Sequence, residues 1–273
     1  MTAARDDVYT HGHHDSVLRS HRWRTAENSA HYLLPQLRPG LSLLDVGCGP
    51  GTLSADLAQR VAPGQVVGID VESDVVELAR RHATDVGASN VELLVGDFRT
   101  AGLTPASFDV VHAHQVLQHL SDPVGALAEM ARLARPGGLV AVRDGDYSGM
   151  TWAPASPGLD RWLEVYLQVT RHNRAEANAG RFLPAWARQA GLDDTTYTTS
   201  TWTFATPDDR AWWADLWADR VVASNLAEQA VAYGVASAVE LADIAVAWRS
   251  WAEDPDAVFV ILHGELVARV PAG

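Results

Sequence analysis

Short apolar runs alternate with amphipathic stretches through the first half of the chain. The apolar runs predict buried strands at 43–46, 65–69, 91–95, 108–113 and 139–143. Apolar residues at helical spacing predict helices over 20–37, 52–60, 73–86 and 123–134. Alternation of strand and helix is typical of a parallel sheet with helices on both faces, so the fold class is α/β.

The second half departs from this alternation. Helical spacing predicts helices over 159–174 and 180–190, and an alternating Thr-rich, aromatic stretch predicts a strand over 195–205. Capped helices then precede a last strand over 257–270.

We therefore divide the chain into three parts within one domain. These are an N-terminal arm and helix (1–38), a core (39–206 with 255–273) and a helical cap insertion (207–254).

The strand at 43–46 leads into the motif G-x-G-x-G, formed by Gly47, Gly49 and Gly51. Glycines permit a tight turn that brings backbone close to a ligand, and the following helix presents its N-terminal amides there. The spacing differs from the G-x-G-x-x-G of dinucleotide sites. Asp45 would repel a pyrophosphate, but it can accept a hydrogen bond from an ammonium group, directly or through water.

A second acid, Asp70, ends the next predicted strand, 23 residues after Gly47 (70 − 47). An acid about 20 residues beyond a Gly-rich loop is placed to accept from both hydroxyls of a ribose. The two elements together predict a site for a ligand that carries a ribose and an ammonium group.

Over about residues 40–145 these elements resemble the class I S-adenosylmethionine-dependent methyltransferases, with the glycines as motif I. The resemblance implies a Rossmann-like, doubly wound sheet of seven mostly parallel strands, with an antiparallel last strand and an N-terminal helical lid. It implies S-adenosylmethionine as cofactor and S-adenosylhomocysteine as product. The acid after the third strand would accept from the adenine amino group. On this basis we expect cofactor contacts from Trp23, Arg24, Asp45, Gly47, Cys48, Gly49, Asp70, Val71, Gly96, Asp97, Phe98 and His114.

Composition limits the class of acceptor that we expect and the cellular compartment in which the chain would act. A formal net charge of −13 disfavours polyanionic partners, so we expect a small-molecule acceptor and neither nucleic acid nor membrane. The single cysteine, Cys48, cannot form an intrachain disulfide, and no apolar run approaches membrane length. These features favour a cytoplasmic location, and the sequence leaves both a monomer and a homodimer open.

Methyl transfer needs an aligned nucleophile and, where the acceptor loses a proton, a base. Polar groups near the strand ends supply candidates for the base or an acceptor anchor, namely His119, His114, Tyr9 and Asp146. Tryptophans at helical spacing favour a core, although some could form an aromatic pocket. The expected acceptor-binding residues are Tyr9, His112, His119, Tyr147, Trp213 and Trp217; no metal ligands are expected.

Within the family, the chain most resembles the ubiquinone-biosynthesis-like branch. The stretches 9–13 and 22–27 also look like actinobacterial enzymes of secondary metabolism. Some of those methylate C3 of an indole in tryptophan-derived diketopiperazines or tryptamine derivatives, giving a pyrroloindoline. We take this reaction as the leading hypothesis, ahead of O- or N-methylation of another metabolite. An NAD(P)-dependent oxidoreductase and a non-catalytic cofactor-binding protein stay open as alternatives from other classes.

Overall fold

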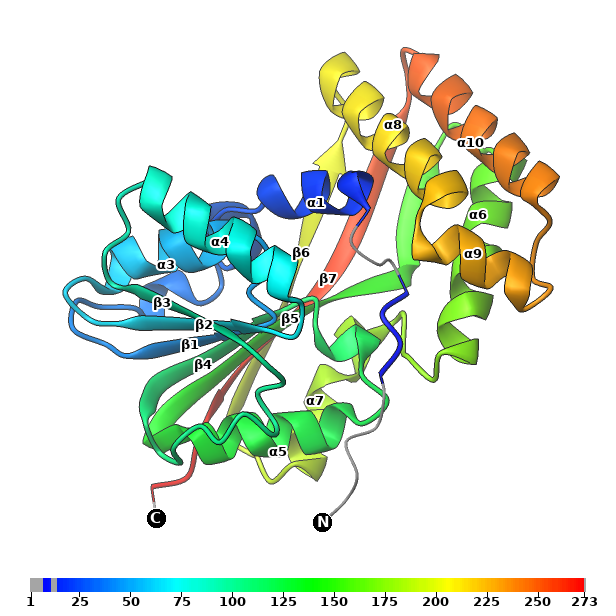
Figure 1. Cartoon of the computed structure of the whole chain (residues 1–273). Coiled ribbons are helices and arrows are strands. Elements are labelled where there is room, and N and C mark those ends of the chain that lie inside the picture. The colour runs from blue at the N-terminus through cyan, green and yellow to red at the C-terminus, as the bar shows by residue number, and fades with distance from the viewer. Residues whose placement is uncertain (1–6, 11–13, 273) are drawn as a thin grey trace.

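A seven-stranded sheet runs through the molecule in the order β3-β2-β1-β4-β5-β7-β6 (Figure 1). The computed structural model describes residues 7–10 and 14–272. Strands β1 to β5 pair in parallel, whereas β7 is antiparallel to both β5 and β6, which confirms the predicted sheet. The strands span Leu43–Val46 (β1), Val66–Asp70 (β2), Val91–Val95 (β3), Phe108–His114 (β4), Ala134–Ala153 (β5), Thr195–Phe204 (β6) and Val258–Arg269 (β7).

Helices cover both faces of the parallel strands. Helices α3 and α4 lie on one face, and α5 and α7 lie on the other (Figure 1). Successive strand residues point to opposite faces, so Leu43 packs on the α3 side and Leu44 on the α5 side. The helices span Asp15–Arg22 (α1), Ala26–Ser29 (α2), Thr52–Val61 (α3), Ser73–Asp85 (α4), Pro123–Leu133 (α5), Pro157–His172 (α6), Ala179–Gln189 (α7), Pro207–Ala223 (α8), Asn225–Ala232 (α9) and Ala238–Glu253 (α10), with 3₁₀ turns Leu34–Gln36 (η1) and Leu117–His119 (η2).

Strand β5 differs most from the sequence prediction, which gave it only 139–143. It has 20 residues and pairs with β7 on both sides of a register shift between Asp146 and Thr151. Asp144 and Asp146 interrupt the apolar run, yet both are buried, so hydropathy hides the continuation of the strand. The long strands β5, β6 and β7 extend past the parallel strands and carry a second group of helices (Figure 1).

This second group forms its own hydrophobic core. We call it the cap; it comprises α6, α8, α9, α10 and the adjoining ends of β5, β6 and β7. The Trp162 ring centroid lies 4.6 Å from that of Trp217 and 5.0 Å from that of Trp248. All three indoles are buried, so these tryptophans are core residues as the spacing predicted. Helix α6 packs in this core, although the sequence analysis counted its residues with the sheet.

The segment before β1 bridges the sheet and the cap. The helix predicted over 20–37 is instead two short helices and a 3₁₀ turn, because Thr25 starts a new helix with a capping box. Helix α1 packs against α8, and the Arg19 guanidinium donates to the Asp219 carboxylate at 2.6 Å. A segment remote in sequence from the cap is therefore tied to it.

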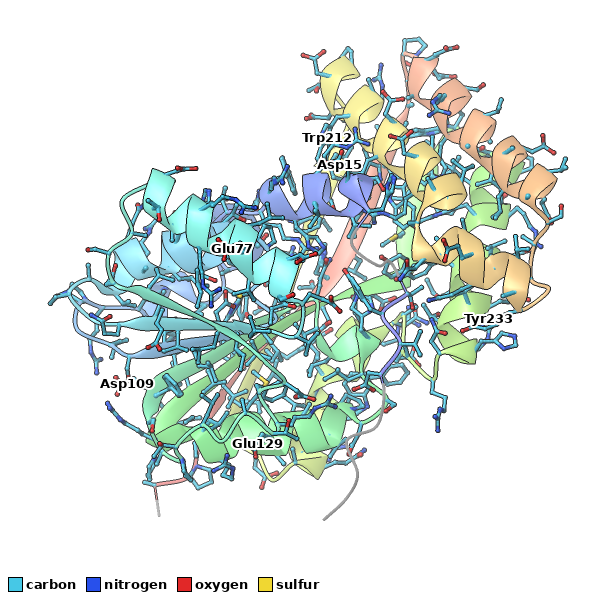
Figure 2. The ribbon with its side chains drawn as sticks, in the orientation of Figure 1. Asp15, Glu77, Asp109, Glu129, Trp212 and Tyr233 are labelled. Atoms are coloured by element: carbon cyan, nitrogen blue, oxygen red, sulfur yellow. The ribbon has the colours of Figure 1, made fainter. Side chains whose placement is uncertain are left out.

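The outward faces of the helices are polar. Figure 2 shows Glu77 on α4 and Glu129 on α5 directed away from the sheet. Among the residues that the structure describes, no helix combines the length and the apolar character needed to cross a bilayer.

The cap core gives the first prediction. Trp248→Ala should lower the free energy of unfolding by about 3–5 kcal/mol, because it removes a fully buried indole and leaves a cavity. Val246→Ala on the same helix, where Val246 is 62% exposed, should change it by less than about 0.5 kcal/mol. Urea unfolding measures both, and equal effects would contradict the packing described.

Candidate functional site

The glycine motif forms a tight turn between β1 and α3. Gly47, Gly49 and Gly51 have φ of 65°, 55° and 79°, the left-handed region that side chains disfavour. A Cβ at Gly47 would lie 2.5 Å from Val116 Cγ2, and one at Gly51 would lie 2.7 Å from Ala79 Cβ. The nearest atom to a Cβ at Gly49 would be His21 Nδ1 at 3.6 Å. The turn is therefore tightly packed at Gly47 and Gly51, whereas at Gly49 a Cβ would make only an ordinary contact, with His21.

Asp70 joins this turn to the end of β2. Its carboxylate accepts from the Gly49 N–H at 3.0 Å and from the Glu72 N–H at 3.1 Å. Val71, the next residue, is 61% exposed. An acid beside an exposed apolar side chain is a suitable edge for a nucleoside, which has polar hydroxyls and a flat apolar base.

Asp97, at the end of β3, has a strong protein partner. The Arg99 guanidinium donates to both Asp97 oxygens, with Arg99 Nη2 at 2.7 Å from Oδ2. Arg99 also pairs with Asp7 at 2.8 Å, and Asp7 accepts from the Ser121 N–H at 2.8 Å. These bonds raise the pKa of Arg99, foremost the one to Asp97. Through Arg99, the N-terminal segment is thus bonded to Asp97, the acid expected to bind adenine, next to the buried Phe98.

Asp45 and His112 lie in the interior beneath the turn. The Asp45 carboxylate is 2.8 Å from His112 Nδ1 and accepts from the Ser54 hydroxyl at 2.5 Å. Asp45 is 2% exposed and His112 is fully buried. The structure brings the two expected site residues together, but away from the cavity described below.

The segment leaving β4 carries buried polar groups. His114 is 4% exposed, and neither of its ring nitrogens has a hydrogen-bond partner among the described residues. Burial, followed by the charge of Arg24, holds the pKa of His114 well below its usual value. Gln115 has a φ of 54° and accepts from Arg24 Nη2 at 2.5 Å. Unpartnered buried nitrogens at a strand end are typical of a ligand site.

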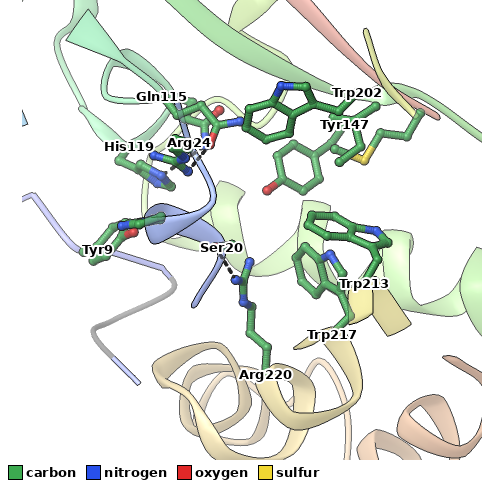
Figure 3. Close-up of a pocket in the computed structure, with 14 residues that line it drawn as sticks. Tyr9, Ser20, Arg24, Gln115, His119, Tyr147, Trp202, Trp213, Trp217 and Arg220 are labelled. Atoms are coloured by element: carbon green, nitrogen blue, oxygen red, sulfur yellow. Dashed lines mark hydrogen bonds between the residues drawn. The ribbon is translucent and has the colours of Figure 1, made fainter. Parts of the chain in front are cut away.

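Side chains from the N-terminal segment, the β4 exit and the cap enclose a cavity of about 30 Å³ (Figure 3). The expected residues Arg24, Tyr9, His119, Tyr147, Trp213 and Trp217 all line it, whereas His112, His114 and Asp146 do not. Its remaining lining residues are Ser20, His21, Gln115, Gln118, Met150, Trp202, Arg220 and Ile261. The lining contains two arginines and no carboxylate.

Tyr9 and His119 meet at one side of this cavity, with ring centroids 4.8 Å apart and nearly perpendicular planes. Burial lowers the pKa of His119 to about 3 and raises that of Tyr9 to about 12, so both are neutral at pH 7. Gln118 Oε1 accepts from the Gly145 N–H at 3.0 Å, so its Nε2 must donate to His119 Nε2 at 3.1 Å. The imidazole proton is therefore assigned to Nδ1.

Two acids follow the middle of β5. Asp146 forms a bidentate ion pair with Arg181, with Arg181 Nε donating to Oδ2 at 2.6 Å and Nη2 to Oδ1 at 2.5 Å. Asp144, which the sequence analysis did not select, is fully buried and accepts from the Gln118 N–H at 3.1 Å. Burial raises the pKa of Asp144 to about 7. The hydrogen bond from the Gln118 N–H to Asp144 positions the 3₁₀ turn that carries His119.

Arg220 is the main lining residue that the sequence analysis missed. It is 4% exposed and projects from α8 (Figure 3). The sequence does contain a signal for it. Trp213, Trp217 and Arg220 are spaced at i, i+4 and i+7, which places the arginine on the same helix face as the two tryptophans.

His119 supports a prediction about pH. In the folded chain the His119 imidazole takes up a proton only near pH 3, whereas an unfolded histidine does so near pH 6.5. Acidification therefore favours the unfolded state, which binds this proton first. Between pH 7 and 5, wild type should lose about 1–2 kcal/mol more than His119→Gln, measured by urea unfolding. His172→Gln, on the exposed side of α6, controls for loss of an imidazole. An unchanged pH dependence in His119→Gln would contradict the burial described.

Comparison with known proteins identifies the family of the chain. A family model described as a methyltransferase domain matches residues 37–187. An uncharacterized methyltransferase of Schizosaccharomyces pombe is 30% identical over 276 residues, covering 98% of each chain. A ubiquinone biosynthesis O-methyltransferase of Leptothrix cholodnii is 34% identical over 155 residues, 56% of this chain and 65% of that protein. Nocamycin O-methyltransferase of Saccharothrix syringae is 36% identical over 133 residues, 48% of this chain and 45% of that protein.

Solved structures share the fold. The YcgJ protein of Bacillus subtilis superposes with a TM-score of 0.60 at 17% identity, covering 90% of this chain and 100% of that one. A geranyl diphosphate methyltransferase in complex with S-adenosylmethionine gives a TM-score of 0.54 at 19% identity, covering 93% and 88%. The left-handed glycine turn, the acid that ends β2 and the unpartnered nitrogens of His114 at the end of β4 fit S-adenosylmethionine as cofactor. The chain belongs to the class I S-adenosylmethionine-dependent methyltransferases.

Proposed function

We propose that this methyltransferase acts on a small aromatic natural product, and that the acceptor binds in the cavity between the sheet and the cap. The observation that carries the proposal is the aromatic wall formed by Tyr147, Trp202, Trp213 and Trp217. These rings come from β5, β6 and α8, and they face the turn after β4 (Figure 3). Flat aromatic faces favour a planar guest.

The cofactor contacts expected from the sequence form the second part of the proposal. Bound S-adenosylmethionine supplies a methyl group on a sulfonium. Asp70 and Gly49 hold the ribose side, Val71 and Phe98 flank the adenine, and Arg24 holds the amino-acid carboxylate. The bond from Arg24 to Gln115 at 2.5 Å supports its assignment, because it sets the guanidinium at the β4 exit.

The N-terminal segment serves as a lid in this proposal. A cavity of about 30 Å³ holds roughly one water molecule, so an aromatic acceptor requires a wall to move. Tyr9, Ser20, His21 and Arg24 all belong to residues 1–38, the part we assign as the lid. Residues 1–6 and 11–13, including His11 and His13, lie outside the described residues.

The reaction that we propose first is C3-methylation of an indole in a tryptophan-derived diketopiperazine or tryptamine derivative. Such a reaction needs an aromatic enclosure and polar groups that orient the acceptor. Tyr9 and His119 supply the polar groups, and both are uncharged at pH 7. O-methylation of a phenol is the second candidate, because two relatives are named as O-methyltransferases.

Cofactor binding tests the second part of the proposal, the cofactor contacts. Asp70→Ala should weaken S-adenosylmethionine binding by about 1–3 kcal/mol in calorimetric titration, because ribose hydroxyls and the Gly49 N–H lose their acceptor. Glu72→Ala is the matched control, since Glu72 contributes only its backbone N–H to this cluster. Unchanged affinity in Asp70→Ala would refute the assignment.

An acceptor screen tests the first part of the proposal, the aromatic acceptor. Labelled S-adenosylmethionine is incubated with C3-substituted indoles, phenols and aromatic amines, and product position is read by NMR. We expect turnover of an indole, and a drop in kcat/KM of about 10-fold or more in Trp213→Ala from lost aromatic contact. Trp212→Ala, its neighbour outside the cavity lining, should have little effect. Absence of turnover of any aromatic by enzyme that binds cofactor would overturn the proposal.

A further inference from the structure

The charge of the cavity is opposite to that of the chain. The chain has a formal net charge of −13, yet the cavity lining holds Arg24 and Arg220 and no acidic residue. Neither arginine forms an ion pair with a carboxylate within residues 7–10 and 14–272. Buried cations normally have a paired anion, because desolvation of an isolated charge is costly.

Arg220 is the more buried of the two arginines. Its Nη2 donates to the Ser16 carbonyl at 3.1 Å and to the Ser20 hydroxyl at 3.0 Å, both neutral acceptors in α1. Its guanidinium lies 4.5 Å from the centre of the Trp217 ring. Its Nε has no hydrogen-bond partner among the described residues. Burial lowers the pKa of Arg220, which shows that its surroundings compensate the charge only in part.

The two arginines lie on different sides of the cavity. Arg24 reaches the β4 exit through Gln115, whereas Arg220 extends from α8 beside Trp213 and Trp217 (Figure 3). S-adenosylmethionine has one carboxylate, which we assign to Arg24. Arg220 is then left for the acceptor, on the side where the aromatic wall would hold its ring.

A purely structural role for Arg220 would be to tie α8 to α1. Its two neutral acceptors need only a hydrogen-bond donor, so a charge is not required for that role. Arg210 on the same helix is also buried, but its Nη1 donates to the carbonyls of Ala205, Pro255 and Ala257, and it lies outside the cavity lining. Arg210 therefore has the carbonyl partners of a structural arginine, and Arg220 combines fewer partners with access to a ligand cavity.

We propose that the aromatic acceptor carries a carboxylate and that Arg220 binds it, with the ring held against Trp213 and Trp217. This inference rests on the aromatic acceptor proposed above and adds its charge. A diketopiperazine and a tryptamine have no carboxylate, so among the proposed acceptors the inference favours an indole or a phenol that carries one. Guanidinium groups bind carboxylates through charge-assisted N–H donors, and the Nε–H of Arg220 is a donor without a partner among the described residues. The chemical class is thus an aromatic acid.

Matched ligands that differ only in charge test this. Indole-3-acetate and indole-3-acetamide share ring and shape, and calorimetric titration in the presence of S-adenosylhomocysteine measures binding without turnover. Wild type should bind the acid about 10- to 100-fold more tightly than the amide. In Arg220→Gln the preference should fall to about twofold or less, while Arg220→Lys should retain a preference for the acid.

The ratio of acid to amide affinity separates charge recognition from packing, because loss of the α1–α8 tie would weaken both ligands alike. Arg210→Gln is the matched control and should keep the wild-type ratio. Equal binding of acid and amide by wild type, or a preference that survives in Arg220→Gln, would overturn the inference and leave the aromatic-acceptor proposal intact. If S-adenosylhomocysteine binds and neither indole does, the inference fails together with that proposal.

Discussion

The backbone conformation of the turn between β1 and α3 constrains the whole site. Three glycines take left-handed φ values there, and a Cβ at Gly47 would collide with Val116, which follows β4. The close approach fixes the spacing between the glycine turn and the segment that carries Gln115 and His119. Asp70 adds a hydrogen bond to Gly49, so the ends of β1, β2 and β4 are held as one unit. A parallel sheet brings these ends to one edge, and the glycines let them pack closely.

The cavity depends on a different feature, the extra length of β5, β6 and β7. These strands continue beyond the parallel part of the sheet and carry a tryptophan-rich core of their own. The same α8 that contributes Trp217 to this core presents Trp213 and Arg220 to the cavity. Cap stability and cavity shape are therefore coupled through one helix. Helix α1, which is part of the lid segment, is bonded to that helix through Arg19 and Arg220.

Polar groups around the cavity are arranged to stay uncharged or to remain without a protein counter-ion. His114 and His119 are held neutral by burial, and Tyr9 keeps its proton. Arg24 keeps a positive charge with neutral partners, and burial lowers its pKa to about 10. An acidic protein with a cationic cavity that has an aromatic wall would exclude polyanions at its surface while favouring a small ligand with one negative group. The contrast in charge between surface and cavity selects ligands by charge, as the aromatic wall selects them by shape.

The sequence alone determined the α/β class, the glycine turn, the acids that end β2 and β3, and through them the family and its cofactor. These features are local: a strand, its terminal residue and the turn after it lie within a few positions, so spacing reveals them. Only the tertiary structure decided that β5 runs on for 20 residues, that Asp45 pairs with His112 in the interior, and that Arg220 reaches a cavity shared with Tyr9. These depend on contacts between residues far apart in the chain, where burial overrides polarity and no periodicity records which partner a side chain meets.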